Sequence, residues 1–263
     1  MTTLAITGAG GRMGQRLIAI GRQTDGVRVV AAIAKGNSPN LERDAGELAG
    51  VGNIGLPVTS DLRTKPDVLI DFTHPAGMKH WLKVCRDRHI AMVIGTTGLT
   101  DDDHAAIDEA ARDIAILQAG NMSLGVTVMC KIVEEVARLF GDGYDAEVLE
   151  AHHRFKKDAP SGTAEMIAAA ILKGLNRDKS ALVYGRHGGE VTRQQKDVTM
   201  HSLRMGDEVG LHTAYFGGLG ERLEITHKAT SRDTFVHGAV KGRKVAVRTK
   251  AGAVSDRADV LKK

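Results

Sequence analysis

Short apolar runs alternate with amphipathic segments through the first half of the chain. Five of these runs have the length of a buried strand and lie at residues 4–7, 27–33, 68–70, 91–94 and 114–117. Between them, apolar residues recur at helical spacing, as Met78, Trp81, Leu82 and Cys85 do. Apolar strands separated by helices are typical of a parallel sheet covered on both faces. We therefore predict a Rossmann-like α/β domain with a doubly wound parallel sheet.

The pattern changes after Gln118. Long helices are expected at 125–140 and 162–175, with a strand at 145–153 between them. After a polar stretch at 176–197, which predicts irregular structure, three strand-like runs follow closely at 198–204, 209–216 and 222–227. Consecutive strands joined by short glycine turns indicate antiparallel pairing. The second half is therefore expected to form an α+β domain with a mixed, largely antiparallel sheet.

Composition excludes several classes of protein without identifying a function. With 42% hydrophobic and 26% charged residues, the chain is not disordered, and no run of 18 apolar residues predicts a membrane span. Residues 1–11 lack the basic start of a secretory signal, so we expect a cytoplasmic protein. Cys85 and Cys130 fall on apolar helical faces, which favours buried thiols over redox or metal chemistry. The net charge of +4 is compatible with nucleic acid, an anionic small ligand or no specific partner.

A glycine-rich turn stands between the first predicted strand and the first helix. Gly8, Gly11 and Gly14 are spaced so that backbone N–H groups and a helix N-terminus can approach a pyrophosphate. Met13 occupies a position where the strict GxGxxG pattern has glycine, and a purely structural turn is the alternative. The strand–turn–helix context favours dinucleotide binding.

The residues after the second strand bear on which dinucleotide binds. About 20 residues beyond the glycine turn, an acidic side chain would hold the ribose hydroxyls of NAD. Ala34 and Lys35 stand there instead, and a cation without a carboxylate suits the 2′-phosphate of NADP, with Arg12 as a second contact. The alternative is that Lys35 is a solvated loop lysine.

The segment 150–164, EAHHRFKKDAPSGTA, concentrates ionisable groups before a predicted helix. Five of the six residues at 152–157 can carry positive charge, and Ser161 is placed to cap the helix. The N–H groups of Gly162 and Thr163 then lie at the positive end of the helix, which suits an anion such as a carboxylate. A metal site is disfavoured, because adjacent histidines on a strand point to opposite faces. A solvated loop is the alternative, but clustered cations at a helix N-terminus favour function.

Five motifs together resemble a known enzyme family. They are GAGGRMG at 8–14, DFTHP at 71–75, VIGTTG at 93–98, EAHHRFKKDAPSGTA at 150–164 and GERLEITHKATSR at 220–232. They resemble the 4-hydroxy-tetrahydrodipicolinate reductases, also called dihydrodipicolinate reductases, of lysine and diaminopimelate biosynthesis. The resemblance implies hydride transfer from NADPH or NADH to dihydrodipicolinate, formed from 4-hydroxy-tetrahydrodipicolinate by loss of water, to give tetrahydrodipicolinate.

The resemblance also implies roles for residues of the second domain. His152 and Lys156 would be catalytic, with Lys156 as the general acid and His152 at the family's position for a proton donor or acceptor. The substrate carboxylates would be held by His153, Ser161, Gly162, Thr163 and Arg232. No metal is implied. The family further implies a homotetramer built through the sheet of the second domain.

Cofactor contacts follow from the same resemblance. The pyrophosphate would lie on Gly8, Ala9, Gly10, Gly11, Arg12 and Met13, and the adenosine ribose near Ala34 and Lys35. The nicotinamide would lie near Gly95, Thr96, Thr97, Ala119, Gly120, Asn121 and Met122. Phe72 is equally well explained as a nicotinamide contact or as a core residue. Many family members carry Glu-Arg in place of Ala34-Lys35, so we expect NADPH to be preferred over NADH.

The resemblance divides the chain into a discontinuous dinucleotide-binding domain, 1–123 and 233–263, around a substrate-binding and oligomerisation domain, 124–232. The stretch 241–250 differs from the family because it is rich in cations, which we expect to form a solvated face. It also contains Gly242, which would weaken a helix. Another nicotinamide-dependent dehydrogenase, such as an aspartate dehydrogenase, is one alternative, which the 152–164 segment disfavours. A nucleic-acid binder is a second, disfavoured by the missing recognition motifs.

Overall fold

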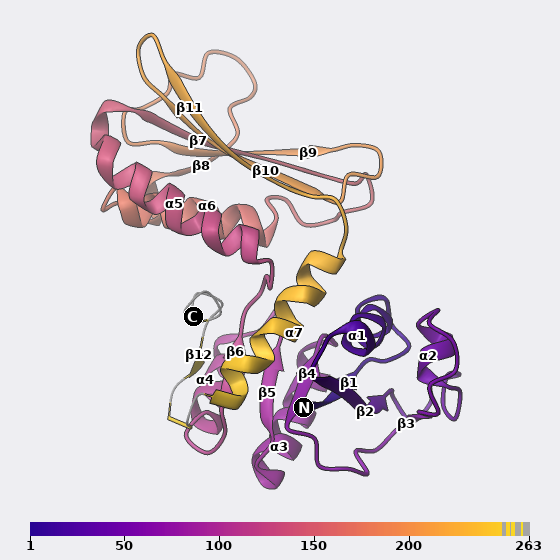
Figure 1. Ribbon diagram of the computed structural model, residues 1–263. Helices are drawn as coiled ribbons and strands as arrows, with labels where there is room; N and C mark the ends of the chain where they lie inside the picture. The colour runs from indigo at the N-terminus through magenta and orange to yellow at the C-terminus, as the bar shows by residue number, and fades with distance from the viewer. Residues whose placement is uncertain (249–250, 253, 256–258, 260–263) are drawn as a thin grey trace. The chain divides into compact units, whose positions relative to one another are not determined.

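The computed structural model describes residues 1–248, 251–252, 254–255 and 259. The chain forms two compact units, each with a sheet of its own (Figure 1). The first unit consists of Met1–Leu124 and Asp233–Lys263, and the second of Gly125–Arg232.

The first unit is built on a seven-stranded sheet with the order β12-β6-β5-β4-β1-β2-β3. Its strands are β1 (Thr2–Thr7), β2 (Val27–Ile33), β3 (Val58–Thr59), β4 (Val68–Asp71), β5 (Ala91–Ile94), β6 (Ile116–Gln118) and β12 (Val254–Ser255). Every pairing between neighbouring strands is parallel. The carboxyl ends of these strands therefore share one edge, where open parallel sheets bind ligands.

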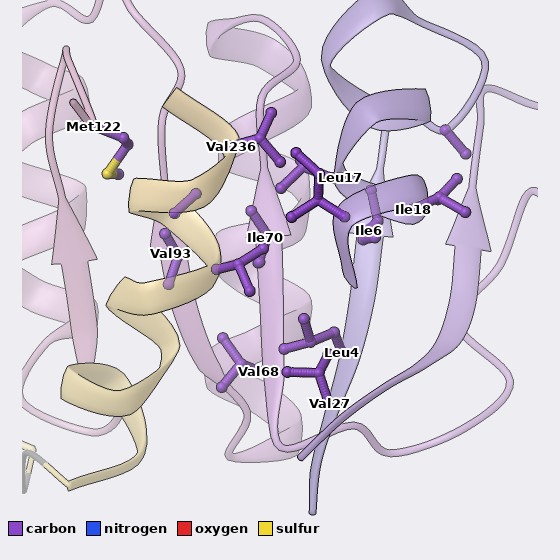
Figure 2. Packing of buried hydrophobic residues seen from close by; sticks show 14 of the residues in the cluster. Leu4, Ile6, Leu17, Ile18, Val27, Val68, Ile70, Val93, Met122 and Val236 are labelled. Carbon is purple, nitrogen blue, oxygen red and sulfur yellow. The ribbon is translucent and has the colours of Figure 1, made fainter. Parts of the chain in front are cut away.

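Helices cover both faces of this sheet. Side chains alternate along β1, so that Leu4 and Ile6 pack with Leu17 and Val236 on one face, as Figure 2 shows. Those two partners come from α1 (Arg12–Gln23) and α7 (Asp233–Arg248). Ala5 joins the cluster on the other face, to which α3 (Pro75–Arg88) and α4 (Asp101–Ala110) contribute. The two separate clusters confirm the predicted doubly wound, Rossmann-like sheet. A short helix, α2 (Ala45–Leu48), lies between β2 and β3 and was not expected.

The second unit holds a five-stranded sheet with the order β11-β10-β7-β9-β8. Its strands are β7 (Asp145–His152), β8 (Leu182–Tyr184), β9 (Val198–Arg204), β10 (Gly210–Gly217) and β11 (Arg222–Ala229). The pairings of β10 with β11 and β7 are antiparallel, whereas β9 pairs with β7 and β8 in parallel. The mixed sheet is confirmed, but antiparallel pairs are half of the total, because β7 inserts between the consecutive strands β9 and β10. β8 lies in the stretch expected to be irregular.

Two helices, α5 (Leu124–Phe140) and α6 (Gly162–Gly174), pack on one face of the second sheet (Figure 1). Val126, Cys130 and Val133 point from α5 into this core, as their spacing predicts. Cys85 and Cys130 are both buried and neither forms a disulfide, and burial raises the pKa of Cys85 to about 12. No helix in the described residues is both long enough and apolar enough to cross a bilayer.

The basic stretch 241–250 does not form the uniformly solvated face that its charge suggests. It continues α7 to Arg248, and Gly242 is accommodated inside the helix. Lys241 and Lys244 are exposed, but Arg243 is buried and donates to the carbonyl oxygen of Val240. Lys250 lies outside the described residues.

Candidate functional site

In the turn between β1 and α1, backbone atoms leave no room for a side chain at Gly14, and the end of the Asn40 side chain packs against Gly10. A β-carbon on Gly14 would lie 2.1 Å from the carbonyl oxygen of Gly8, and one on Gly10 would lie 2.3 Å from Nδ2 of Asn40. Gly8 has a φ of +67°, which favours glycine. Gly11 supplies no side-chain cap to α1, and the first turn of that helix has no acidic residue. The positive end of α1 is therefore open to an anion.

This turn forms one wall of a cavity of about 770 Å³ at the carboxyl edge of the sheet. Six of the residues expected to contact the cofactor line it: Gly8, Gly10, Gly11, Ala34, Lys35 and Phe72. Further lining residues, to which the sequence gave no role in cofactor binding, are Asn37, Ser38, Asn40, Ser60, Thr73, His74, His80 and Trp81. Their position along the chain could have indicated them, since most of them follow β2 or β4, at the edge where parallel sheets bind ligands. The volume, the glycine turn and the lysine fit a dinucleotide.

Three residues that were expected to contact the pyrophosphate do not line this cavity. Ala9 is fully buried, and Met13 is half-buried against the core. Arg12 is exposed at the start of α1. The structure therefore brings Lys35, but not Arg12, to the wall of the cavity.

The two turns expected near the nicotinamide follow the adjacent strands β5 and β6. Gly95 and Thr96 are buried and Thr97 is exposed, so the first turn presents only its end to solvent. In the second turn, Ala119, Asn121 and Met122 are buried, and Gly120 is exposed. The side chain of Asn121 accepts from the backbone N–H of Ser123, which holds this turn at the end of its strand.

Asp71, at the end of β4, ties three turns of the first unit together, although the sequence assigned it no role. Its Oδ1 accepts from the hydroxyls of Thr7 at 2.6 Å and Thr73 at 2.8 Å, and its Oδ2 accepts from Thr96. Thr7 precedes the glycine turn, Thr73 lines the cavity, and Thr96 belongs to the turn after β5. This buried carboxylate thus fixes the loops at the ligand edge of the sheet.

A second cluster of polar residues lies in the second unit, where the charged 150–164 segment begins. Glu150 is fully buried on β7, and its two oxygens accept from both terminal nitrogens of Arg204, at 2.8 and 2.9 Å. They also accept from Nδ1 of His152 at 2.5 Å and from the backbone N–H of Ser161 at 3.2 Å. Burial alone would raise the pKa of Glu150, but the bonds from Arg204 and His152 outweigh it and lower the pKa to about 2.

Ser161 connects this carboxylate to the start of α6. Its hydroxyl accepts from the N–H of Ala164, so it caps the helix as the sequence predicts. The same hydroxyl lies 3.0 Å from Nε2 of His212, a buried residue of β10 that sequence reasoning missed. Burial, with a contribution from His152, lowers the pKa of His212 to about 3, so this ring is neutral. The β-strand register places His212 opposite Glu150, a pairing that no local pattern could reveal.

The remaining predicted site residues surround this buried network. Lys156 is mostly buried, and its ammonium pairs with Asp158 at 2.8 Å. His153 is half-buried, and its Nδ1 has no hydrogen-bond partner among the described residues. Gly162 and Arg232 are exposed, and Thr163 lies in the first turn of α6. The cations at 152–157 near a helix N-terminus and an unpaired imidazole nitrogen fit an anionic ligand.

Among the described residues, no three or more histidines, cysteines and acids are grouped so that they could hold a metal ion. His152 is committed to Glu150 instead.

Sequence comparison matches both halves of the chain to one family. Residues 2–122 match the family model described as dihydrodipicolinate reductase, N-terminus, and residues 125–261 match the one described as dihydrodipicolinate reductase, C-terminus. Together the two models span nearly the whole chain.

Solved structures share the fold. A dipicolinate-bound dihydrodipicolinate reductase from Paenisporosarcina sp. TG-14 is 24% identical, with 97% of each chain covered and a TM-score of 0.74. An amine dehydrogenase from Mycobacterium smegmatis is 14% identical, with 97% of this chain and 94% of the other covered and a TM-score of 0.66. An aspartate dehydrogenase from Thermotoga maritima is 9% identical, with 96% and 100% covered and a TM-score of 0.50. At these identities, the likeness concerns the fold alone.

Proposed function

Because this chain belongs to the dihydrodipicolinate reductase family, we propose that its two polar clusters carry the two halves of that family's reaction. The activity is that of an NAD(P)H-dependent reductase that converts dihydrodipicolinate to tetrahydrodipicolinate in lysine and diaminopimelate biosynthesis. An aspartate dehydrogenase would share the first unit, but the match over 125–261 favours the reductase.

The cavity of the first unit is our proposed dinucleotide site. The backbone of Gly8, Gly10 and Gly11 would hold the pyrophosphate at the open end of α1, with Lys35 near the adenosine ribose. When bound, the nicotinamide supplies the hydride. The turns after β5 and β6, 95–97 and 119–122, would line its nicotinamide side, because both follow strands at the ligand edge of the sheet.

We assign NADPH as the preferred form because of the side chains around the ribose end of the cavity. Lys35 and Ser38 line that wall, and Ala34 stands where a carboxylate would repel a 2′-phosphate. A lysine supplies a point charge and a serine a hydroxyl donor to such a group. NADH has no 2′-phosphate, so it would bind the same site without these contacts to Lys35 and Ser38.

The loop after β7 is our proposed substrate site. His153, Ser161, Gly162, Thr163 and Arg232 would hold the two carboxylates, which gives several charge-assisted bonds to a dianion. Lys156 would give a proton from its ammonium as hydride reaches the ring, and His152 would exchange a proton through its imidazole. The observation that carries this assignment is the run of cations at 152–157 before the N-terminus of α6, next to the network of Glu150, His152 and Ser161.

A coupled assay tests the function. The upstream synthase generates the substrate, and oxidation of NADPH and NADH is followed separately. We expect substrate-dependent oxidation, faster with NADPH at low cofactor concentration. Lys156→Ala should lower kcat by about 100-fold or more without weakening dinucleotide binding. Lys157→Ala, which changes the exposed neighbour, is the matched control. No substrate-dependent oxidation with either dinucleotide would refute the proposal.

The assembly and its location belong to the same proposal. We propose a homotetramer formed through the second sheet, whose face opposite α5 and α6 carries Leu203, 43% exposed. Static light scattering should give four times the mass of the chain. Cys85 and Cys130 form no disulfide, which agrees with a reducing compartment, the cytoplasm.

A further inference from the structure

We propose that Glu150 is a positioning residue, which holds the Nδ1–H of His152 and thereby makes Nε2 the nitrogen that exchanges a proton. The inference rests on the proposed function, which gives His152 its place in the reaction but assigns nothing to Glu150. It concerns a fully buried carboxylate that does not line the proposed cofactor cavity.

The geometry around the carboxylate leaves the imidazole little freedom. Glu150 and His152 are two residues apart on β7 and therefore on the same face of the strand. Oε2 of Glu150 lies 2.5 Å from Nδ1 of His152, and the bidentate pair with Arg204 holds the carboxylate in place. An ionised carboxylate can only accept hydrogen bonds, so Nδ1 must carry the hydrogen. In the neutral ring, Nε2 then bears the lone pair.

The other ring nitrogen is kept clear by a glycine. A β-carbon on Gly210 would lie 3.1 Å from Nε2 of His152 and 3.5 Å from its Cδ2. The ring of His212 lies edge-on at 5.2 Å between centroids and limits rotation on the adjacent side. Glycine at 210 thus leaves Nε2 room that any larger side chain would take.

The charges that face His152 come from several elements. Glu150 lies on its own strand, Arg204 on β9, the neutral His212 on β10, and the Lys156–Asp158 pair on the loop before α6. Burial lowers the pKa of His152, Glu150 opposes this, and Lys156 and Arg204 lower the pKa further. Removing the negative charge at position 150 leaves only the lowering influences, so the pKa of His152 should fall.

The test combines Glu150→Gln in the full-length enzyme with two measurements. In ¹⁵N NMR, neutral His152 of the wild type should carry its hydrogen on Nδ1, whereas the variant should show a mixed or Nε2–H form, since a glutamine amide can donate to Nδ1. In steady-state kinetics, kcat should fall by about tenfold or more, and the acidic limb of the pH profile should move to lower pH. Dinucleotide affinity should not change.

Glu147→Gln is the matched control. Glu147 lies three residues earlier on the same strand and is also paired with an arginine and a histidine, Arg186 and His201. It does not contact His152, so its variant should keep the wild-type tautomer and the position of the acidic limb. Glu150→Asp retains the charge and should recover the acidic limb more fully than Glu150→Gln does.

Two results would overturn the proposal. One is a wild-type His152 that carries its hydrogen on Nε2. The other is a folded Glu150→Gln variant with an unchanged tautomer and pH profile. If Glu150→Gln does not fold, Glu150→Asp and the wild-type spectrum decide. Absence of reductase activity in the wild type would refute the proposed function, but the NMR signature would still test the role of Glu150.

Discussion

The ring of Phe72 fills the space that a β-carbon of Gly95 would need. Such a carbon would lie 2.3 Å from Cζ of Phe72 and 2.4 and 2.6 Å from its two Cε atoms. Phe72 follows β4 and lines the proposed cofactor cavity, and the N–H of Gly95 donates to the carbonyl oxygen of Asp71. The aromatic ring that lines the cavity thus packs directly on the adjacent turn, and this packing favours glycine at position 95.

Gly95→Ala should therefore displace Phe72 from the cavity wall. We expect the free energy of unfolding to fall by about 1–3 kcal/mol, because the added methyl overpacks the site, and the affinity for NADPH to fall with it. Urea unfolding and titration calorimetry measure the two effects. Gly120→Ala is the control for stability, since its β-carbon would come no closer than 3.9 Å to Thr97. Equal stability of the two variants would contradict the packing argument.

Asp71→Asn should loosen three turns at once. The amide replaces one acceptor oxygen by a donor, so the hydroxyl of Thr96, or those of both Thr7 and Thr73, loses its bond to this side chain. We expect a loss of about 1–3 kcal/mol in unfolding free energy and weaker dinucleotide binding. Asp67→Asn provides the comparison, because Asp67 also accepts from a threonine of β1, Thr3, but at the exposed start of the strands. It should leave dinucleotide affinity unchanged.

Cofactor preference should depend on Lys35. Lys35→Ala removes the cation near the proposed 2′-phosphate site, so kcat/KM for NADPH should fall by about tenfold or more while that for NADH changes little. Ala34→Glu should raise kcat/KM for NADH, since a carboxylate can hold the ribose hydroxyls. Both values come from initial rates with each dinucleotide in the coupled assay. Equal use of NADPH and NADH by the wild type would count against this prediction.

Local patterns predicted the parts of the fold that local physics determines. The apolar strands of the first unit and the cap of α6 by Ser161 follow from burial and helix-end chemistry. Three acids, Asp101–Asp103, begin α4, where negative charge suits the positive end of the helix, and Thr100 is the cap. The pairing of β7 with β9 could not be predicted, because strand neighbours in a sheet are chosen by the whole core.

The same distinction holds for the proposed site. The glycine turn and the cationic loop are continuous in sequence, so their residue types revealed them. Glu150 appeared in the motif without a role, and Arg204 and His212 are 54 and 62 residues beyond it. Only the register of β7 with β9 and β10 brings these residues together. Arg243 likewise reads as one more surface cation until the packing of α7 buries it.

His212 should make the protein lose stability as the pH falls below neutrality. Its pKa is about 3 in the folded protein, against an ordinary value of 6.5, because burial disfavours the charged ring. Between pH 6.5 and pH 3, His212 is therefore protonated in the unfolded chain but neutral in the native state. The contribution of His212 to the free energy of unfolding is at its maximum above pH 6.5. It declines by up to about 1.4 kcal/mol per pH unit as the pH falls from 6.5 to 3.

His212→Gln isolates this contribution, because a glutamine amide can still reach the hydroxyl of Ser161 but does not titrate. We expect the variant to be less stable than the wild type at pH 7, where packing is altered, but to lose stability less steeply between pH 6.5 and 5. Urea midpoints at pH 7, 6 and 5 measure both slopes. That range lies above the ordinary pKa of 4.5 for Glu150, so its depressed value does not contribute there. Parallel slopes for variant and wild type would show that His212 accepts its proton in the native state.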